Sequence, residues 1–498
     1  MEIWSFLTFL LVGILILKYL KQLWSSRNYP PGPFQLPFIG GLWRIGRTFN
    51  RDTFTKLAKQ YGNIFTIWVG SYPVVVLSGY QAVKEGLINH AEEFGERPVT
   101  PTTKAMCKKR GIMTTNGHTW RQQRWFGQAT LRKLGLGKKY AEHVIEEEAL
   151  GIVEVFARTK GHPIDPVVPM TSAIFKVICG VIWGNQFYPS EEENQKIIEH
   201  LATFVKFGDS IFYVLYEMFP RLMEHFSTPL SSAIAKIDKA ISLLKQEIAK
   251  HKEHEMQHDP QDFSDFYLYQ IEKTKSDPDS TFNEDNLAQC ILEFLAAGTE
   301  TTASALQWAL LRMATHPDIQ DRVYEEMEEV LGTSQSICYQ DRKKLPYTNA
   351  VIHEVLRANY VLPLGIVRRN TKDVNIYGYT IPKRTFIVPD LGSVFLDPKQ
   401  WETPGEFNPN HFLDKDGHFV AREEFLPFGA GTRVCPGEQL ARMELFLFFT
   451  HLMRAFRFQF PEETGEMTKA PVLGFTFHPQ PYKICAIPRS DSSQEKLK

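Results

Sequence analysis

The chain has 498 residues, of which 43% are hydrophobic and 23% are charged, the balance of a folded protein with a large core. Its 56 basic and 57 acidic residues give a formal net charge of -1, which argues against a protein that binds nucleic acid through a general positive field. Six cysteines stand singly along the chain, without a C-x-x-C pair. This spacing excludes a disulfide scaffold and favours a reducing compartment for the body of the protein.

The first segment is an uncharged apolar run from Ile3 to Leu17, which reaches about 18 residues with its neighbours and is long enough to span a bilayer. A cleaved signal peptide has a basic start and a small-x-small cleavage site. Here Glu2 precedes the run, no such site follows, and the positive charges of Lys18, Lys21 and Arg27 come after it. We therefore expect a retained membrane anchor, with the rest of the chain in the cytosol.

A proline-rich stretch follows, from Pro30 to Pro33 (PPGP), and its fixed torsions and missing donors predict a stiff, extended hinge. No linker divides the rest of the chain, and no internal repeat is visible. The expected divisions are an anchor at 1–24, a proline-rich hinge at 25–40, a single domain at 41–490 and a flexible tail at 491–498.

The body opens with a β hairpin and is then mainly helical. From 65 to 77 two β-rich runs are broken at Gly70-Ser-Tyr-Pro73, which is a hairpin signal. Helical periodicity is found at 79–90, 119–131, 139–157, 194–207, 231–255, 283–315, 319–331 and 347–358. Short β-like runs return at 375–381, 384–389 and 474–486. We therefore predict a mainly α protein with a minor β region.

Three histidines, His251, His254 and His258, recur at spacings of three and four residues and could share one helical face as metal ligands. The residues around them are strongly charged and lead into Asp259-Pro260, which is a loop signal. We therefore interpret this stretch as a solvated face and not as a metal site.

The segment with the clearest chemistry surrounds Cys435, which stands between a turn-rich stretch at 425–431 and an apolar helix predicted at 439–449. The neighbouring N–H groups and the positive end of that helix are expected to lower the pKa of the thiol and favour the thiolate that binds metal. Gly429 lets the backbone pass close to a flat ligand, and Arg433 can reach an anionic group at its edge. Most isolated cysteines are buried structural residues, so the surrounding pattern has to decide.

The ten residues from Phe428 to Gly437 match F-x-x-G-x-R-x-C-x-G, which resembles the haem-binding signature of the cytochrome P450 family. The resemblance extends from the anchor to the C-terminal β region and points to microsomal family two, most like subfamily J, through passages such as 345–354 (LPYTNAVIHE). It implies a triangular α-rich prism fold and a haem b (iron protoporphyrin IX) whose iron is held by Cys435. The single domain would then be the haem-binding catalytic domain of a monooxygenase.

The run from Ala297 to Thr302 (AGTETT) places small and hydroxyl residues inside an apolar helix. Gly298 removes a side chain, and the Thr301 hydroxyl can bond back to the carbonyl of Ala297, which loosens the helix locally. By itself this pattern could be a helix kink. The resemblance implies a distal-helix motif instead, in which Glu300 and Thr301 support proton delivery and Ala297 contacts the haem.

Glu354 and Arg357 are three residues apart in a predicted helix, so they share a face and can pair. Most such pairs are solvated surface bridges. The resemblance to the family's E-x-x-R motif implies a structural pair that braces the segment leading to the haem loop. His411 stands where many family members have a further arginine, and we interpret it as a variant of this brace.

Trp120 and Arg124 lie one turn apart and resemble the family's W-x-x-x-R helix. Haem carries two propionates, and arginines are natural partners of carboxylates. The resemblance implies that the propionates are held by Arg97, Arg124, Arg368 and Arg433. The further haem contacts that it implies are Trp120, Ala297, Phe428 and Gly429.

By resemblance, the substrate pocket is apolar and suits a long hydrophobic molecule. Its expected lining includes Phe204, Phe207, Leu362, Ile366 and Phe477. Subfamily J members epoxidise or hydroxylate polyunsaturated fatty acids such as arachidonate and also oxidise drug-like molecules, while a sterol or a carotenoid stays open as the substrate. A haem-thiolate isomerase that rearranges peroxides and a non-enzymatic haem sensor are the alternative classes, and the distal motif argues against both.

The resemblance also implies a place in the endoplasmic reticulum membrane, with the catalytic domain on the cytosolic face. Electrons would come from NADPH through the flavins of cytochrome P450 reductase, with cytochrome b5 as a further donor. The candidate basic contacts for the reductase are Arg132, Lys133, Lys138, Lys139 and Arg442. The other expected partners are the lipid bilayer and a small hydrophobic substrate, with no nucleic acid.

Overall fold

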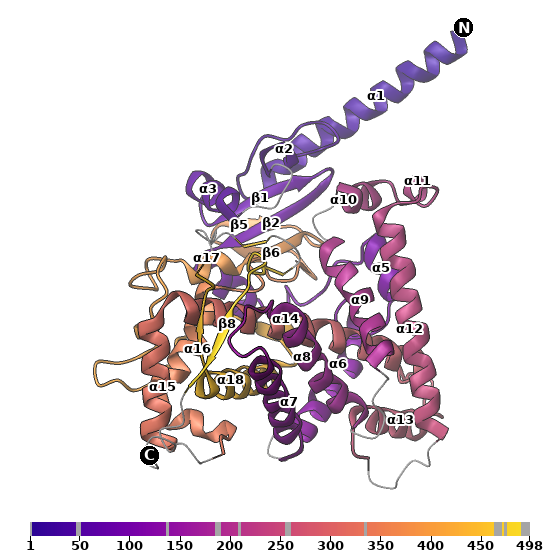
Figure 1. The fold of residues 1–498 in the computed structure, drawn as a ribbon. Coiled ribbons are helices and arrows are strands. Elements are labelled where there is room, and N and C mark those ends of the chain that lie inside the picture. Colours follow the sequence, from indigo (N-terminus) through magenta and orange to yellow (C-terminus); the bar gives the residue numbers. More distant parts are fainter. Residues whose placement is uncertain are drawn as a thin grey trace, which may run out of the picture. The chain divides into compact units, whose positions relative to one another are not determined.

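The computed structural model describes residues 2–45, 51–135, 139–184, 191–207, 211–253, 260–332, 336–462, 471–472 and 476–489. The chain divides into two compact units, which are described separately. The first unit comprises residues 1–98, 363–400 and 429–434, and the second comprises residues 99–362, 401–428 and 435–498. Helices dominate and the sheets are small (Figure 1), so the mainly α fold with a minor β region is confirmed.

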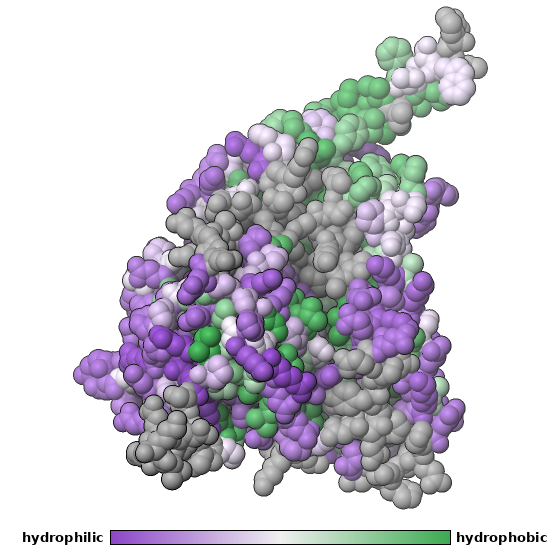
Figure 2. Space-filling model, in the orientation of Figure 1, coloured by the Kyte–Doolittle hydropathy of each residue, from purple (hydrophilic) through white to green (hydrophobic). Residues whose placement is uncertain are grey.

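The first unit begins with α1 (Glu2–Ser25), which continues into the short 3-10 helix η1 (Ser26–Asn28). Large apolar side chains such as Trp4, Phe9 and Leu17 are exposed along α1. Figure 2 shows green, hydrophobic residues along much of the visible face of this helix. Within the described part of the chain, α1 is the helix long and apolar enough to cross a membrane. This is consistent with the expected membrane anchor.

A four-stranded sheet with the order β1-β2-β6-β3 is the centre of the first unit. Strand β1 (Ile64–Val69) pairs antiparallel with β2 (Tyr72–Ser78), β2 runs parallel to β6 (Phe386–Asp390), and β3 (Arg368–Arg369) pairs antiparallel with β6. Gly70 (φ +60°) takes the left-handed conformation that the two-residue turn between β1 and β2 requires. The predicted hairpin is thus present, and a second one joins β4 (Val374–Ile376) to β5 (Tyr379–Ile381).

The remaining elements of the first unit are α2 (Leu42–Ile45), α3 (Arg51–Tyr61), α4 (Tyr80–Lys84), η2 (Glu85–Asn89), α17 (Leu391–Phe395) and η5 (Gly431–Arg433). The helix predicted at 79–90 is confirmed as α4 followed by η2, and η2 is a π-helix. Gly86 explains how this wider turn fits, since a Cβ there would lie 2.3 Å from Leu77 Cδ1 on β2. A residue without a side chain therefore lets the π-turn pack against the sheet.

The second unit is an array of helices around α14. Its first elements are α5 (Pro101–Cys107), α6 (Gly117–Gly135), α7 (Lys139–Arg158), α8 (Val167–Trp183), α9 (Glu191–Phe207), α10 (Ile211–Met218), α11 (Pro220–Met223), α12 (Pro229–Glu253) and α13 (Phe263–Lys273). The later ones are α14 (Glu284–Thr315), α15 (Pro317–Leu331), η3 (Tyr339–Lys343), α16 (Pro346–Ala358), η4 (Pro409–Phe412), α18 (Glu438–Ala455), β7 (Phe456–Gln459) and β8 (Cys485–Pro488).

Helix α14 begins where the side chain of Asn283 accepts a hydrogen bond from the main-chain N–H of Asn286. It is buried along most of its length because α8, α12, α16 and α18 pack against it (Figure 1). One large apolar cluster joins α14 to α7, α8, α16 and α18, and a second joins it to α8, α12 and α13. This central helix carries the predicted distal motif, which is thereby held by the core.

Several features of the second unit differ from the predictions, which also lack α5, α10, α11 and α13. Helix α8 is absent from them because its sequence is apolar nearly all round, without the periodicity of a helix that faces solvent on one side. The strand predicted at 474–486 is wrong over most of its described part, because of residues 476–486 only Cys485 and Ala486 belong to a strand, β8, which pairs with β7. Residues 473–475 lie outside the described residues.

Candidate functional site

Cys435 opens the final segment of the second unit, directly before α18. Its main-chain N–H donates to the carbonyl of Phe428 at 2.9 Å, which closes the loop between them. The N–H groups of Gly437 and Glu438 donate to the sulfur, and the Arg124 charge acts in the same direction, but burial outweighs them and raises the pKa of the Cys435 thiol. The prediction of a lowered pKa for the Cys435 thiol is therefore wrong, because the sequence shows the local N–H groups and not the burial.

The middle of the same loop, residues 429–434, belongs to the first unit and is pressed against the chain around η2. A Cβ on Gly431 (φ +73°) would lie 2.0 Å from the carbonyl oxygen of Leu87, so only glycine fits there. Thr432 Oγ1 donates to the carbonyl of Ala91 at 3.2 Å. A side chain on Gly429 (φ +73°) would instead meet no protein atom within 4 Å, so the backbone is open at this point.

Three of the predicted propionate ligands, Arg97, Arg368 and Arg433, are buried together in the first unit. Arg97 Nη1 donates to the carbonyls of Ile366 and Val367 at 2.6 and 3.0 Å. Arg368 Nη2 donates to the carbonyl of Ala430 at 2.7 Å, and Arg433 Nε donates to that of Gly95 at 2.8 Å. These bonds to main-chain carbonyls hold the guanidinium groups in place, and guanidinium groups suit carboxylates.

The predicted pair Trp120 and Arg124 lies on α6 in the second unit, and the Arg124 side chain is buried. Burial lowers the pKa of the Arg124 guanidinium, and the opposite effect of Cys435 shows that the two groups are close enough to interact. Helix α6 therefore brings a buried positive charge near the cysteine.

The predicted distal run lies in the middle of α14. Between Asn286 and Met313 the single exposed residue is Ala297, and Thr301 follows it by one turn. Thr301 Oγ1 donates to the carbonyl of Ala297 at 2.7 Å, as predicted. Gly298 allows close packing, since a Cβ there would lie 2.8 Å from Ile178 Cδ1 on α8. The helix is therefore buried along this stretch except at Ala297, a small exposed residue one turn from the Thr301 hydroxyl.

Glu300 points to a partner that the sequence did not suggest. Its carboxylate lies 2.9 Å from His478 Nε2, and Thr476 Oγ1 lies 2.7 Å from the same nitrogen. All three side chains contribute to one polar group beside α14. No pattern in the sequence could have found His478, because 178 positions separate it from Glu300 and only the fold brings them together.

The predicted pocket residues fall into three sets. Phe477 is buried in the second unit. Its main-chain N–H donates to the carbonyl of Val361, and its carbonyl accepts from the side chains of Ser304 and Trp308. Leu362 is partly buried in the same unit, while Ile366 belongs to the first unit. Phe204 and Phe207 lie on α9, but their side chains are outside the described residues.

Glu354 and Arg357 form a fully buried bidentate pair, with Nε to Oε2 at 2.7 Å and Nη2 to Oε1 at 2.6 Å. Arg357 also donates to the carbonyls of Pro404 and Glu406. The carboxylate of Glu354 accepts from the N–H of Asn408 at 2.8 Å and lies 3.2 Å from His411 Nδ1. This group, here called the brace, ties α16 to the segment from 404 to 411.

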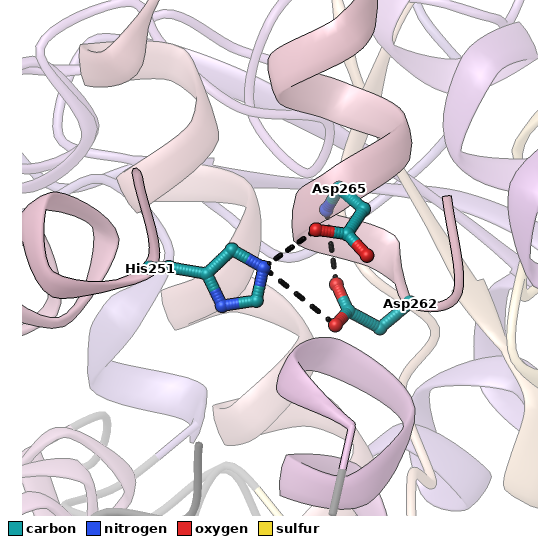
Figure 3. Close-up of side chains that lie close together, drawn as sticks. All are labelled: His251, Asp262 and Asp265. Carbon is teal, nitrogen blue, oxygen red and sulfur yellow. Dashed lines mark hydrogen bonds and ion pairs between the residues drawn. The ribbon is translucent and has the colours of Figure 1, made fainter. Parts of the chain in front are cut away.

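The prediction of a solvated face at His251 is wrong, because His251 is buried at the end of α12. Figure 3 shows its ring facing Asp262 and Asp265, with Nε2 at 2.8 Å from Asp265 Oδ1 and 3.6 Å from Asp262 Oδ2. Burial raises the pKa of Asp262 to about 7. Burial alone would lower the pKa of His251, but the hydrogen bond to Asp265 and the two carboxylates raise it. His254 and His258 lie outside the described residues.

The side chains described above fit an iron porphyrin with two propionates. The thiol of Cys435 is a metal ligand by type, buried arginines suit carboxylates, and the backbone at Gly429 is open to a flat group. A helical fold with these donors defines the class of haem-thiolate proteins.

The chain belongs to the cytochrome P450 family, because the family's sequence model matches residues 30–486. It is 38% identical to cytochrome P450 2J2 of Homo sapiens over 476 residues, which cover 96% of this chain and 94% of the human protein. It is 37% identical to cytochrome P450 2J5 of Mus musculus over 485 residues and 39% identical to cytochrome P450 2K4 of Oncorhynchus mykiss over 490 residues, covering 96% of each chain in both cases. The resemblance to family two and subfamily J is confirmed, and the protein is a monooxygenase with haem b as its cofactor.

Proposed function

We propose that this monooxygenase inserts one oxygen atom from dioxygen into a long hydrophobic substrate by epoxidation or hydroxylation. The favoured substrates are polyunsaturated fatty acids such as arachidonate, and drug-like molecules come second. The observation that carries the proposal is the opening on α14, where exposed Ala297 lies one turn from a hydroxyl, Thr301, and next to an ion-paired carboxylate, Glu300. An acid and a hydroxyl at an accessible point of a buried helix suit proton delivery to a bound ligand.

The proposed ligand of the iron is Cys435, and the bound haem supplies the redox and oxygen chemistry. Arg97, Arg124, Arg368 and Arg433 would hold the propionates. Trp120, Ala297, Phe428 and Gly429 would contact the ring. The protein's part is to fix the cofactor and the substrate, because these side chains are positioned by main-chain carbonyls, α6 and α14.

Thr301 and Glu300 are the proposed catalytic residues. The Thr301 hydroxyl donates to Ala297 in this structure, and a hydroxyl rotor can turn to donate elsewhere. Glu300 would take up a proton from solvent and pass it on to Thr301, and His478 would hold the Glu300 side chain in place. Phe477, Leu362, Ile366, Phe204 and Phe207 would form the apolar lining that orients the substrate.

Electrons would come from NADPH through the flavins of cytochrome P450 reductase, with cytochrome b5 as a further donor. Arg132 and Lys133 are exposed on α6 and are the favoured contacts. Arg442 is occupied by Glu438 and His353, so it is a weaker candidate, and the side chains of Lys138 and Lys139 lie outside the described residues. We further propose that residues 1–24 anchor the catalytic domain, 41–490, to the cytosolic face of the endoplasmic reticulum membrane, with 25–40 as hinge and 491–498 as tail.

Two experiments test this function. Membranes that hold the protein and reductase should convert arachidonate when NADPH is added. Turnover of a fatty-acid hydroperoxide alone, with none supported by NADPH, would show a peroxide isomerase instead, and turnover of a sterol or carotenoid in preference to arachidonate would change the substrate class. Thr301→Ala should consume NADPH with little product, while Thr301→Ser should retain product formation because it keeps the hydroxyl.

The role of Cys435 is tested by the carbon monoxide spectrum of the reduced protein. Cys435→Ala should lose the thiolate-shifted Soret band. The matched control is Cys338→Ala, because Cys338 is an exposed cysteine of the second unit and has no proposed role. A shifted band that survives Cys435→Ala would contradict the assignment.

A further inference from the structure

The short segment 476–478 lies against α14 in the second unit and is fixed there by its middle residue, Phe477. The Phe477 carbonyl accepts hydrogen bonds from Ser304 Oγ at 3.0 Å and from Trp308 Nε1 at 3.2 Å. Its main-chain N–H donates to the carbonyl of Val361 at 2.8 Å. Both main-chain groups of Phe477 are therefore bonded, which fixes the residues on either side of it.

Glu300 lies on the face of α14 that holds this segment. The same stripe of the helix continues through Ser304 and Trp308, because side chains four residues apart share a face. The two later residues of the stripe bind Phe477, and the first meets His478, with Glu300 Oε1 at 2.9 Å from His478 Nε2. The contact between Glu300 and His478 is thus the end of a row of contacts that positions the histidine ring.

Solvent reaches one end of this row. Ser304 and Thr476 are buried, whereas the side chains of Glu300 and His478 are 26% and 23% exposed. Among the described residues, Glu300 is the ionisable group in contact with the His478 ring. The histidine can therefore exchange protons with water on one side and face a single carboxylate on the other.

Thr476 gives the same ring nitrogen a second partner, since its Oγ1 lies 2.7 Å from His478 Nε2. When Nε2 carries a proton, it donates to the Glu300 carboxylate. After that proton has moved on, the Thr476 hydroxyl can donate to the bare nitrogen, because a hydroxyl is both a donor and an acceptor. Nε2 thus keeps a hydrogen bond in both protonation states, which suits a group that gives up and regains a proton.

We propose that His478 supplies the proton that Glu300 passes to Thr301. The Nε2–H bond of the imidazolium breaks, its proton forms the O–H bond of the Glu300 carboxylic acid, and the neutral ring regains a proton from solvent. No electron is transferred in this step. Histidine suits the role because its charge changes near neutral pH. The inference rests on the proposed function and gives His478 a second task besides holding Glu300.

The test measures the product formed per NADPH consumed by the full-length holoenzyme with reductase and arachidonate, from about pH 6 to about pH 8. This ratio corrects for changes in the rate of electron supply. In the wild type it should fall as the pH rises, because the histidine ring loses its charge. His478→Gln keeps an N–H group that can hold Glu300 but delivers no proton. Its ratio near pH 6 should be about tenfold lower and should vary little with pH.

The glutamine variant separates the two tasks of His478. A wild-type ratio and pH profile in His478→Gln would show that the residue only holds Glu300, and the inference would be overturned. His418→Gln is the matched control, because His418 is an exposed histidine of the same unit that also faces a carboxylate, Asp414, and has no proposed role. It should keep the wild-type ratio at each pH, and an equal loss in both variants would also count against the relay.

Two more variants separate this inference from the function on which it rests. If Glu300→Gln and Thr301→Ala lower the ratio while His478→Gln does not, the proposed function holds and the relay fails. If neither lowers it, the proposed proton delivery is itself wrong. An unchanged thiolate-shifted Soret band after reduction with carbon monoxide shows that His478→Gln is folded. A wild-type ratio that stays constant over this pH range would overturn the inference without any variant.

Discussion

The brace and the histidine cluster are two buried polar groups of the same helical unit, and they balance charge in different ways. In the brace one carboxylate, Glu354, meets one guanidinium, Arg357, and the remaining acceptor positions are taken by Asn408 and His411. In the cluster two carboxylates, Asp262 and Asp265, face a single histidine. The brace can stay charged, whereas the cluster holds one negative charge too many and retains a proton.

This difference in charge balance determines how the contribution of each group to stability depends on pH. A closed pair with matched charges is insensitive to pH near neutrality and fails only when a partner is removed. A group with excess acid is stable only while it holds its extra proton, so its contribution changes within the physiological pH range. The following variants break or sharpen this contrast.

The largest effect is expected from Arg357→Ala. The substitution leaves the Glu354 carboxylate buried beside a histidine and one N–H group, and such an uncompensated charge costs about 3–5 kcal/mol. Urea unfolding of the purified protein measures the loss. Arg357→Lys keeps the positive charge but cannot make two parallel hydrogen bonds to the carboxylate. Its free energy of unfolding should therefore lie between those of the wild type and Arg357→Ala. A loss below about 1 kcal/mol for Arg357→Ala would show that the brace is not a closed unit.

His411→Ala should have a smaller effect, because it removes one partner of Glu354 and leaves the bidentate arginine. We expect a loss of about 1.5–3 kcal/mol, the contribution of a hydrogen bond to a charged group. The control is Asn410→Ala, an exposed neighbour on the same 3-10 turn. If both substitutions have the same effect in urea unfolding, His411 is only a packing residue.

Asp262→Asn tests the pH dependence of the cluster. Burial raises the pKa of Asp262 in the folded protein to about 7, from a value near 3.8 in the unfolded chain. The folded state is therefore favoured most below pH 3.8, and this contribution to stability is lost as the pH rises through about 7. His251, whose pKa is also raised, acts in the same direction. The pKa of Asp265 is lowered because its hydrogen bonds outweigh burial, so its contribution is lost only in acid.

Hydrogen exchange of the α13 amides should therefore show easier opening at pH 8 than at pH 6, by about 1 kcal/mol after correction for intrinsic rates. Asparagine still caps α13 and cannot titrate, so Asp262→Asn should flatten most of this change. An unaltered pH dependence in the variant would place the titrating group elsewhere.

The smallest effect is expected from Arg158→Ala, which breaks an exposed ion pair with Glu154 on α7. Exposed pairs of this kind are worth less than about 0.5 kcal/mol. Urea unfolding should hardly distinguish the variant from the wild type. A larger loss would mean that burial is not what separates the brace from ordinary surface pairs.

The sequence predicted those parts of the site that depend on local spacing. Glu354 and Arg357 are three residues apart, and Thr301 bonds back within its own helix, so a helical pattern suffices for both contacts. His411 and Asn408 reach Glu354 only because the chain returns to α16 after some fifty residues. Such contacts depend on the fold, and His478 beside Glu300 is another of them.

The sequence does contain a pattern from which the burial of His251 could have been predicted. Leu244, Ile248 and His251 occupy successive positions of the buried stripe of α12, so the histidine stands where an apolar residue is due. Its charged neighbours suggested solvent, although they lie on the other faces of the helix. The raised pKa of Cys435 could not have been foreseen in the same way, since burial is a property of the folded chain.

The single exposed position on α14 has a consequence for how the protein can vary. From Asn286 to Met313 nearly every side chain is buried, so most replacements there would cost stability, and Ala297 is the one residue with open surroundings. Position 297 is the exception, because a larger side chain there would press on the proposed haem and substrate and not on the protein core. This makes position 297 the natural starting point for altering where a substrate is oxidised.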